Sequence, residues 1–194
     1  MADATPAAHL IRAVAISGSP SRESRSRRLL AHAVTRLAAA GAETRILDLS
    51  DIPADDLLGR TRSSSIAAAL SEVDAADVLI VGTPVYRAAY SGLLKVFLDL
   101  FTQDALAQKV AIVVATGAGP GHQLAIDHAL RPLLASVGAV VVATGVYGTD
   151  SQFGADGPEP TLLARLERAV AEALVLAGAL SSPDVIPAVS HPSR

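Results

Sequence analysis

The sequence predicts a doubly wound α/β fold, in which helices cover both faces of a parallel sheet. Short apolar runs alternate along the chain with longer segments of helical periodicity. This alternation is typical of strand–helix–strand units joined by right-handed crossovers. Most of the apolar runs are nearly continuous in Val, Ile and Ala, as expected for strands that are buried on both faces. Sheets of this kind bind ligands beyond the carboxyl ends of their strands, so we expect a site there.

Five strands and five helices account for most of the chain. The expected strands are residues 11–17, 44–49, 77–82, 109–116 and 139–146. The expected helices are residues 24–40, a segment near 64–75, and residues 91–102, 121–137 and 159–178. Residues 179–194 contain three prolines and no periodic pattern. We therefore expect one domain over residues 1–178, followed by an irregular carboxyl-terminal tail over 179–194.

The fourth of these helices contains a proline in its interior. Pro132 lacks the N–H group that would donate to the carbonyl of His128, four residues earlier. We therefore expect a kink or a widened turn around residues 127–132 of the helix at 121–137.

Composition narrows the functional classes. The formal net charge is −3, which argues against a nucleic-acid partner bound by bulk electrostatics. The absence of cysteine excludes disulfides, thiol nucleophiles and thiolate metal sites. The five histidines are scattered without a carboxylate-rich ligand spacing, so we expect no metal site. No signal peptide is evident and the apolar runs are too short to cross a membrane, so we expect a cytoplasmic protein with no membrane partner.

The stretch AISGSPSRESRSRRLL, residues 15–30, is the first strand-to-helix connection. Gly18 permits a tight turn there, and the serines can satisfy free N–H groups at the start of the helix. Arg25 and Arg27 lie in the first turn, where the helix dipole disfavours cations unless an anion is bound. The loop matches neither G-x-G-x-x-G nor G-x-x-x-x-G-K-[ST]. A cradle for one terminal phosphate, such as that of FMN, fits it better; the alternative is a solvated helix start with arginines on its outer face.

Two further loops are expected at the same edge of the sheet. Residues 83–86, TPVY, follow the third strand. Pro84 stiffens the backbone, so that main-chain amides could lie against a planar ring, and Tyr86 adds an aromatic surface in a chain with few aromatic residues. Three glycines within residues 117–121 follow the fourth strand and would let the backbone approach a flat ligand closely; a merely flexible loop is the alternative.

Four segments, SGSP…SRS, TPVYRAAYSGLLKVFLDL, LAIDHALRPLL and GTDSQF, together resemble the NAD(P)H-dependent FMN reductases of two-component sulfonate monooxygenase systems. The likeness covers most of residues 11–175. It implies a flavodoxin-like fold, a doubly wound five-stranded parallel sheet with strand order 2-1-3-4-5. It also implies that the FMN phosphate binds near Ser19, Ser24, Arg25, Ser26 and Arg27. By the same match, the isoalloxazine ring lies along Thr83, Pro84, Val85, Tyr86, Thr116 and Gly117.

The resemblance implies a reaction as well. NADPH or NADH transfers a hydride directly to FMN, so no catalytic acid or base is required and none is nominated. Reduced FMN then serves a separate flavin-dependent monooxygenase, of the kind that desulfonates alkane- or methanesulfonates. The shortage of aromatic side chains that could clamp the ring is consistent with an exchangeable flavin.

His128 occupies the position at which these reductases carry a one-residue insertion, typically aromatic, that forms a π-bulge at the tetramer interface. The resemblance makes His128 a candidate for the interface and for flavin release, in a histidine-bearing, methanesulfonate-type branch. It also implies a homo-oligomer, either a tetramer or a dimer. A helical histidine without a functional role is the alternative.

Two other functions remain open on the residues alone. An FMN-retaining reductase of quinones or azo dyes would carry nearly the same loops, and differs in whether flavin dissociates between half-reactions. A flavodoxin-type electron carrier would need no NAD(P)H site. Such carriers tend to be strongly acidic, with aromatic residues on both sides of the ring, whereas this chain has a net charge of −3 and no Trp.

Overall fold

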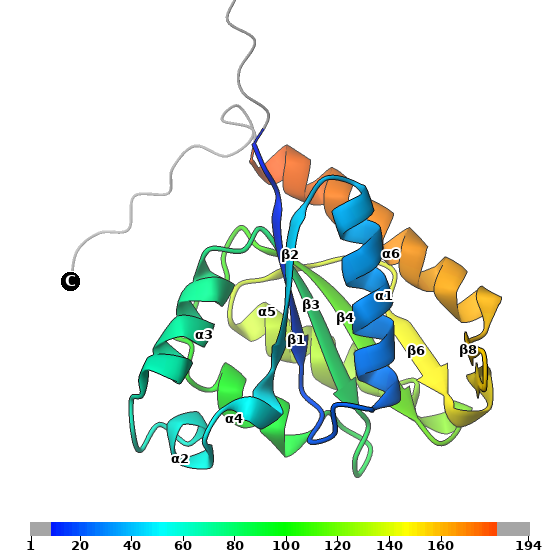
Figure 1. The fold of residues 1–194 in the computed structure, drawn as a ribbon, viewed down its shortest axis with the longest axis horizontal. Helices are drawn as coiled ribbons and strands as arrows, with labels where there is room; N and C mark the ends of the chain where they lie inside the picture. Colours follow the sequence, from blue (N-terminus) through cyan, green and yellow to red (C-terminus); the bar gives the residue numbers. More distant parts are fainter. Residues whose placement is uncertain (1–8, 182–194) are drawn as a thin grey trace, which may run out of the picture.

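The structure, a computed structural model, describes residues 9–181 and contains one main sheet (Figure 1). Five parallel strands lie in the order β2-β1-β3-β4-β5, and a sixth strand, β6, also pairs with β4. The strands are β1 (Arg12–Ser17), β2 (Glu43–Asp48), β3 (Val78–Pro84), β4 (Val110–Gly117), β5 (Val140–Val141) and β6 (Val146–Thr149). This order is that of a flavodoxin-like doubly wound sheet, so the predicted fold class is confirmed.

Helices cover both faces of the sheet, as Figure 1 shows. The main helices are α1 (Arg25–Ala39), α3 (Ser64–Asp74), α4 (Gly92–Leu98), α5 (Arg131–Ser136) and α6 (Pro160–Leu180). α1 and α6 pack on one face, against strand residues such as Ala15 and Ile112. α3, α4 and α5 cover the other face, against the alternate residues such as Ile16 and Val113. Because both faces are covered, residues 110–115 are all buried, which explains their continuous apolar sequence.

Short elements connect these layers. They are η1 (Leu49–Asp51), α2 (Ala54–Leu57), η2 (Pro120–His122), the π-helix η3 (Ile126–Leu130), η4 (Asp150–Gln152), β7 (Phe153–Gly154) and β8 (Gly157–Pro158). The π-helix confirms the widened turn expected around residues 127–132, and Pro132 lies in the first turn of α5 that follows it. The other short elements were not predicted. No helix within residues 9–181 is long and apolar enough to cross a membrane.

Two predicted helix ends are wrong. α4 ends at Leu98 instead of residue 102, because tight i→i+3 hydrogen bonds to the carbonyls of Phe97 and Leu98 close its last turn. α6 continues to Leu180, two residues into the predicted tail, because Ala177 is still buried against the sheet. The remainder of that predicted tail, residues 182–194, lies outside the described residues.

The predicted strand at 139–146 is divided into two. β5 pairs only two residues with β4, and β6 resumes the pairing further along the same strand. Side chains satisfy the backbone in the gap: Arg131 donates to the carbonyls of Val142 and Ala143, both at 2.6 Å. Glu172 of α6 accepts the N–H of Thr144 at 2.8 Å. The interruption therefore depends on side chains of α5 and α6, 11 to 28 residues away in sequence, which the local periodicity of the strand does not report.

Candidate functional site

Three loops, which follow β1, β3 and β4, together with Asp150 after β6, line a cavity of about 310 Å³ at the carboxyl edge of the sheet. The cavity is lined by Ser19, Ser21, Ser24, Arg25, Pro84, Val85, Tyr86, Thr116, Gly117, Ala118 and Asp150. β1 and β3 are neighbours in the sheet, but the chain leaves β1 for β2 on one side and β3 for β4 on the other. The cavity therefore lies at the topological switch point, where open α/β sheets bind their ligands.

Two cavities of about 380 and 410 Å³ lie at the opposite edge of the sheet. They are lined by residues near the amino ends of the strands, such as Arg12, Asp77 and Lys109. Neither contains a residue of the serine-rich loop or of the TPVY segment. We assign the candidate site to the smaller cavity at the carboxyl edge, because the strand topology and the anion-binding groups coincide there.

Eight of the eleven residues predicted to hold FMN line this cavity. They are Ser19, Ser24, Arg25, Pro84, Val85, Tyr86, Thr116 and Gly117. The other three, Ser26, Arg27 and Thr83, do not line it. Ser26 is buried in the first turn of α1, where its hydroxyl lies 3.3 Å from that of Ser24. Three residues that sequence reasoning missed, Ser21, Ala118 and Asp150, complete the lining.

The amino terminus of α1 forms the polar end of the cavity. Ser24 is the N-cap residue, and its hydroxyl accepts the N–H of Arg27 at 3.2 Å. The first turn contains no acidic residue, so no carboxylate there offsets the positive end of the helix dipole. The hydroxyl of Ser19 accepts the N–H of Ser21 at 3.1 Å, and the buried hydroxyl of Ser17 has no partner among the described residues. Free N–H groups and hydroxyls at a helix start suit the oxygens of a phosphate.

The two arginines of the first turn of α1 contact different partners. Arg27 forms an ion pair with Asp48 at the end of β2, with Nε 2.8 Å from Oδ1 and Nη2 2.9 Å from Oδ2. Asp48 is only 8% exposed, and its hydrogen bond raises the pKa of the Arg27 guanidinium. Arg27 therefore connects α1 to β2 through its ion pair with Asp48. Of the two arginines, Arg25 lines the cavity.

Arg25 is held at the cavity by two residues that follow β6. Its Nη1 lies 2.9 Å from Oδ1 of Asp150. Its guanidinium carbon lies 5.9 Å from the centroid of the Phe153 ring, within the range of a cation–π interaction. Asp150 and Phe153 both belong to the GTDSQF segment, one of the four that carry the family resemblance. The sequence alone predicted no role for the Asp150 carboxylate.

A chain of hydrogen bonds joins the loop after β1 to the loop after β3. Thr83 is buried, and its Oγ1 accepts the N–H of Ser91 at 2.9 Å. The hydroxyl of Ser91 donates to the carbonyl of Gly18, whose own N–H donates to the carbonyl of Gly82 at 2.7 Å. Thr83 therefore positions the cavity wall without forming it. Gly18 is required for space, since a Cβ there would lie 2.7 Å from the Cβ of Leu94.

Residues 84–86 form one wall of the cavity, and a tight turn over residues 86–89 follows them. The N–H of Val85 donates to the carbonyl of Thr116 at 2.7 Å, which joins the loops after β3 and β4. Tyr86 and Ala89 exchange two main-chain hydrogen bonds, of 2.9 and 3.1 Å, and the two residues between them have φ angles of 50° and 66°. Such a turn favours Gly or Asn, so the two side chains here cost on the order of 1 kcal/mol each. Strain of this kind is concentrated at functional sites.

Tyr147 of β6 holds the glycine-rich loop on the other side. Its hydroxyl donates to the carbonyl of Gly119 at 2.7 Å. Burial, together with the nearby charge of Asp150, raises the pKa of Tyr147, so the phenol remains a donor. A Cβ on Gly117 would lie 2.5 Å from this hydroxyl oxygen. Glycine is thus required at position 117 because the Tyr147 hydroxyl lies too close for a Cβ.

His128 lies apart from the cavity lining, in the π-helix, and its side chain is exposed. Its N–H donates to the carbonyl of Leu124 at 2.9 Å. Leu124 is itself 62% exposed, so an apolar and an imidazole side chain share this surface. Among residues 9–181, no group of three or more His, Asp or Glu side chains is arranged to hold a metal ion.

A flavodoxin-like sheet with serine hydroxyls, an arginine and a helix amino terminus at its switch point is typical of proteins that bind a phosphate-bearing ligand such as flavin mononucleotide. Comparison with known proteins makes the assignment specific. The chain belongs to the NADPH-dependent FMN reductase family, whose model matches residues 11–154. It is therefore an oxidoreductase that uses NAD(P)H and FMN.

The relatives agree with this assignment. The chain is 42% identical over 152 residues to an FMN reductase (NADPH) from Pseudomonas putida, covering 77% of each protein. It is 37% identical over 147 residues to the NADH-dependent FMN reductase SfnF from Pseudomonas fluorescens, covering 74% of this chain and 79% of the relative. The apo form of the NADH:FMN oxidoreductase EMOB superimposes with a TM-score of 0.81 and 38% identity, over 90% of this chain and 93% of that one.

Proposed function

We propose that this chain binds FMN in the carboxyl-edge cavity, reduces it with NAD(P)H and releases the reduced FMN to a separate flavin-dependent monooxygenase. The phosphate would lie at the amino terminus of α1, and the isoalloxazine ring between residues 84–86 and 116–118. One observation carries the proposal: a single cavity gathers residues of three loops, of which the first suits a phosphate and the other two suit a flat ring.

The residues present fit FMN. Its phosphate is a dianion, and serine hydroxyls, the Arg25 guanidinium and the free N–H groups of α1 are the donors that such a group prefers. The buried hydroxyl of Ser17, directly before Gly18, has no partner among the described residues. The backbone at Val85 is held by its bond to the carbonyl of Thr116 in β4, so a ring along residues 84–86 would meet a fixed wall.

Bound FMN supplies the hydride-accepting chemistry, and the chain supplies binding, orientation and electrostatics. Arg25 and the start of α1 would bind the phosphate and so fix one end of the flavin. Residues 84–86 and 116–118 would hold the ring. Hydride transfer needs no acid or base, and the only ionisable side chains in the lining are Arg25, Tyr86 and Asp150.

The cavity wall favours an exchangeable flavin. Tyr86 is the only aromatic side chain in the lining, and it is 52% exposed. Stacking between two aromatic side chains would hold the ring firmly, because aromatic pairs contribute about 0.5–1.5 kcal/mol beyond their buried area. A wall with one exposed aromatic side chain therefore supports release of the reduced flavin.

The sequence motifs indicate which kind of monooxygenase would receive the reduced FMN. The four segments that carry the family resemblance are similar to reductases of two-component sulfonate systems. The partner would then be a monooxygenase that desulfonates alkane- or methanesulfonates, in the cytoplasm, where NAD(P)H is regenerated. Relatives are named both for NADPH and for NADH, so either nucleotide is a candidate donor.

Self-association is part of the same proposal. The exposed Leu124, just before the π-helix, and His128 within it offer an apolar and hydrogen-bonding surface. A tetramer or dimer that covers this surface would place the widened turn at a subunit interface. His128 would then link subunit packing to the release of flavin.

The test combines turnover with flavin retention. NADPH consumption by flavin-free protein is followed while FMN is added in steps, and the protein is then rapidly desalted. The proposal predicts turnover that saturates with free FMN and flavin that is lost on desalting. Turnover that requires an added quinone, with flavin retained, would indicate the FMN-retaining reductase; no NADPH oxidation at any flavin level would indicate an electron carrier.

A further inference from the structure

Asp150 places a carboxylate inside the cavity to which we assign a phosphate. It lines the same space as Ser19, Ser24 and Arg25, and its Oδ1 lies 2.9 Å from Nη1 of Arg25. A carboxylate next to a dianionic phosphate is unfavourable, because like charges repel and both groups compete for the same guanidinium. The Asp150 carboxylate therefore disfavours the binding of a phosphate, which the other polar groups of the lining favour.

Local hydrogen bonds hold the segment that carries Asp150. The N–H of Thr149 donates to Oε1 of Gln152 at 3.0 Å, which closes the turn η4. Phe153 follows in β7, and the guanidinium carbon of Arg25 lies over its ring, 5.9 Å from the centroid. Residues 149–153 thus interact with Arg25 through one carboxylate and one aromatic ring.

We propose that Asp150 is an internal competitor of the flavin phosphate for Arg25 and keeps the affinity for FMN low. When the cavity contains no phosphate, Asp150 neutralises Arg25, which otherwise lies unfavourably at the positive end of α1. When FMN binds, its phosphate must displace or share this ion pair. The inference rests on the proposed function, because it requires the phosphate at the start of α1, and it assigns the ease of flavin release to one named side chain.

The expected change in FMN affinity follows from the exposure of the Arg25–Asp150 ion pair. Arg25 and Asp150 are each 46% exposed, and ion pairs between such side chains are weak and screened. Removing the carboxylate frees Arg25 and also removes a repulsion with the phosphate. We expect Asp150→Asn to bind FMN about three- to tenfold more tightly than the parent, in low salt.

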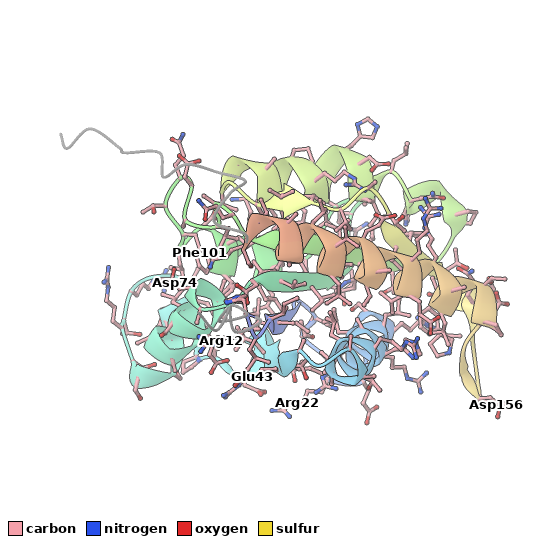
Figure 2. All side chains as sticks on the ribbon, turned by 90° about the horizontal axis from the view of Figure 1, so that it is seen from above. Arg12, Arg22, Glu43, Asp74, Phe101 and Asp156 are labelled. Atoms are coloured by element: carbon pink, nitrogen blue, oxygen red, sulfur yellow. The ribbon has the colours of Figure 1, made fainter. Side chains whose placement is uncertain are left out.

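The experiment compares FMN with riboflavin, which has the same ring and no phosphate. Flavin-free full-length protein is titrated with each ligand, with quenching of flavin fluorescence as the readout. Asp150→Asn should tighten FMN binding and leave riboflavin binding within about twofold. Asp156→Asn makes the same charge change on the neighbouring hairpin, at an exposed residue outside the lining (Figure 2), and should change neither affinity.

A second background tests the dependence on Arg25. In Arg25→Ala protein, the additional change Asp150→Asn should tighten FMN binding by a smaller factor than it does in the parent, since the competition for Arg25 is already gone. An equal factor in both backgrounds would overturn the competition.

Three further results would overturn the inference: unchanged FMN affinity in Asp150→Asn, weaker FMN affinity, or equal tightening of FMN and riboflavin. Weaker binding would mean that Asp150 orients Arg25 for the phosphate. A failure of the proposed function would give a different set of results. The parent would bind FMN no better than riboflavin, and Arg25→Ala would change the affinity for neither ligand. If Arg25→Ala weakens FMN binding and Asp150→Asn does not tighten it, only the inference about Asp150 fails.

Discussion

The hydroxyl of Ser91 donates a hydrogen bond to the carbonyl of Gly18, across 73 residues of sequence. Ser91 also caps α4, because its Oγ accepts the N–H of Leu94 at 3.1 Å. One buried side chain therefore ends the loop after β3, starts a helix and fixes the loop after β1. The two parts of the cavity that we assign to the ring and to the phosphate are held in register by this contact.

Removal of this hydroxyl should destabilise the protein and loosen the site. Ser91→Ala leaves the buried carbonyl of Gly18 and the N–H of Leu94 without their partner, at a cost of about 1–3 kcal/mol. Urea denaturation measures the loss, and FMN affinity should fall in parallel. The matched control is Ser136→Ala, an exposed serine on α5, which should stay within about 0.5 kcal/mol of the parent. Equal stability of the two variants would contradict the structural role of Ser91.

Gly117 and Tyr147 should show coupled effects on stability. Gly117→Ala places a methyl group against the Tyr147 hydroxyl and should cost about 1–3 kcal/mol, as overpacking does. Tyr147→Phe removes the clashing oxygen and loses only the bond to Gly119, at about 1 kcal/mol. Thermal unfolding of the double variant should therefore show less destabilisation than the sum of the two single changes. Gly119→Ala is the control, because a Cβ there meets nothing within 4 Å; strict additivity would contradict the predicted contact.

Asp56 should contribute stability that depends on pH. The buried carboxylate accepts hydrogen bonds from the hydroxyls of Ser63 and Thr61 and from the N–H of Ser63, and these bonds lower its pKa. A pKa below the unfolded value of about 3.9 gives stability that is complete above that pH and is lost as pH falls through the folded value. Asp56→Asn should therefore be less stable than the parent at pH 7, with a difference that shrinks towards pH 3 in urea unfolding. A constant difference over this range would contradict the assignment.

His128 should affect assembly without affecting the fold. Its side chain is exposed on the π-helix, so His128→Ala should keep the secondary structure of the parent, as measured by circular dichroism. If the surface that includes Leu124 is covered by another copy of the chain, sedimentation should show a shift towards smaller species and desalting should show faster loss of flavin. Sedimentation and flavin retention identical to those of the parent would indicate a helical histidine without a role.

Local pattern predicted the fold where strands and helices depend on their own residues. β1, β3 and β4 are nearly continuous apolar runs that become buried on both faces, and α1 has a clear N-cap in Ser24. Pro132 predicted the widened turn, because a missing N–H is a local defect. The division of the last strand was not predictable in this way, since Arg131 and Glu172 satisfy the backbone of the gap from distant helices.

The same distinction applies to the candidate site. The serine-rich loop and the TPVY segment were recognisable because their residue types suit a phosphate and a flat ring. The separation of Arg25 from Arg27 depends on Asp48 and Asp150, which lie far from both arginines in sequence and next to them in space. Asp150 carried no signal for the phosphate site, because a carboxylate is not expected where a phosphate binds.

The placement of the FMN phosphate at the start of α1 is tested most directly by charge reversal at Arg25. Arg25→Glu and the control Arg62→Glu, at an exposed arginine outside the cavity lining, are titrated with FMN and with riboflavin. The account predicts that Arg25→Glu weakens FMN binding by about tenfold to a hundredfold, the range for a lost charge-assisted hydrogen bond, while riboflavin binding and the control change little. Unchanged FMN affinity in Arg25→Glu, or equal losses for FMN and riboflavin, would contradict it.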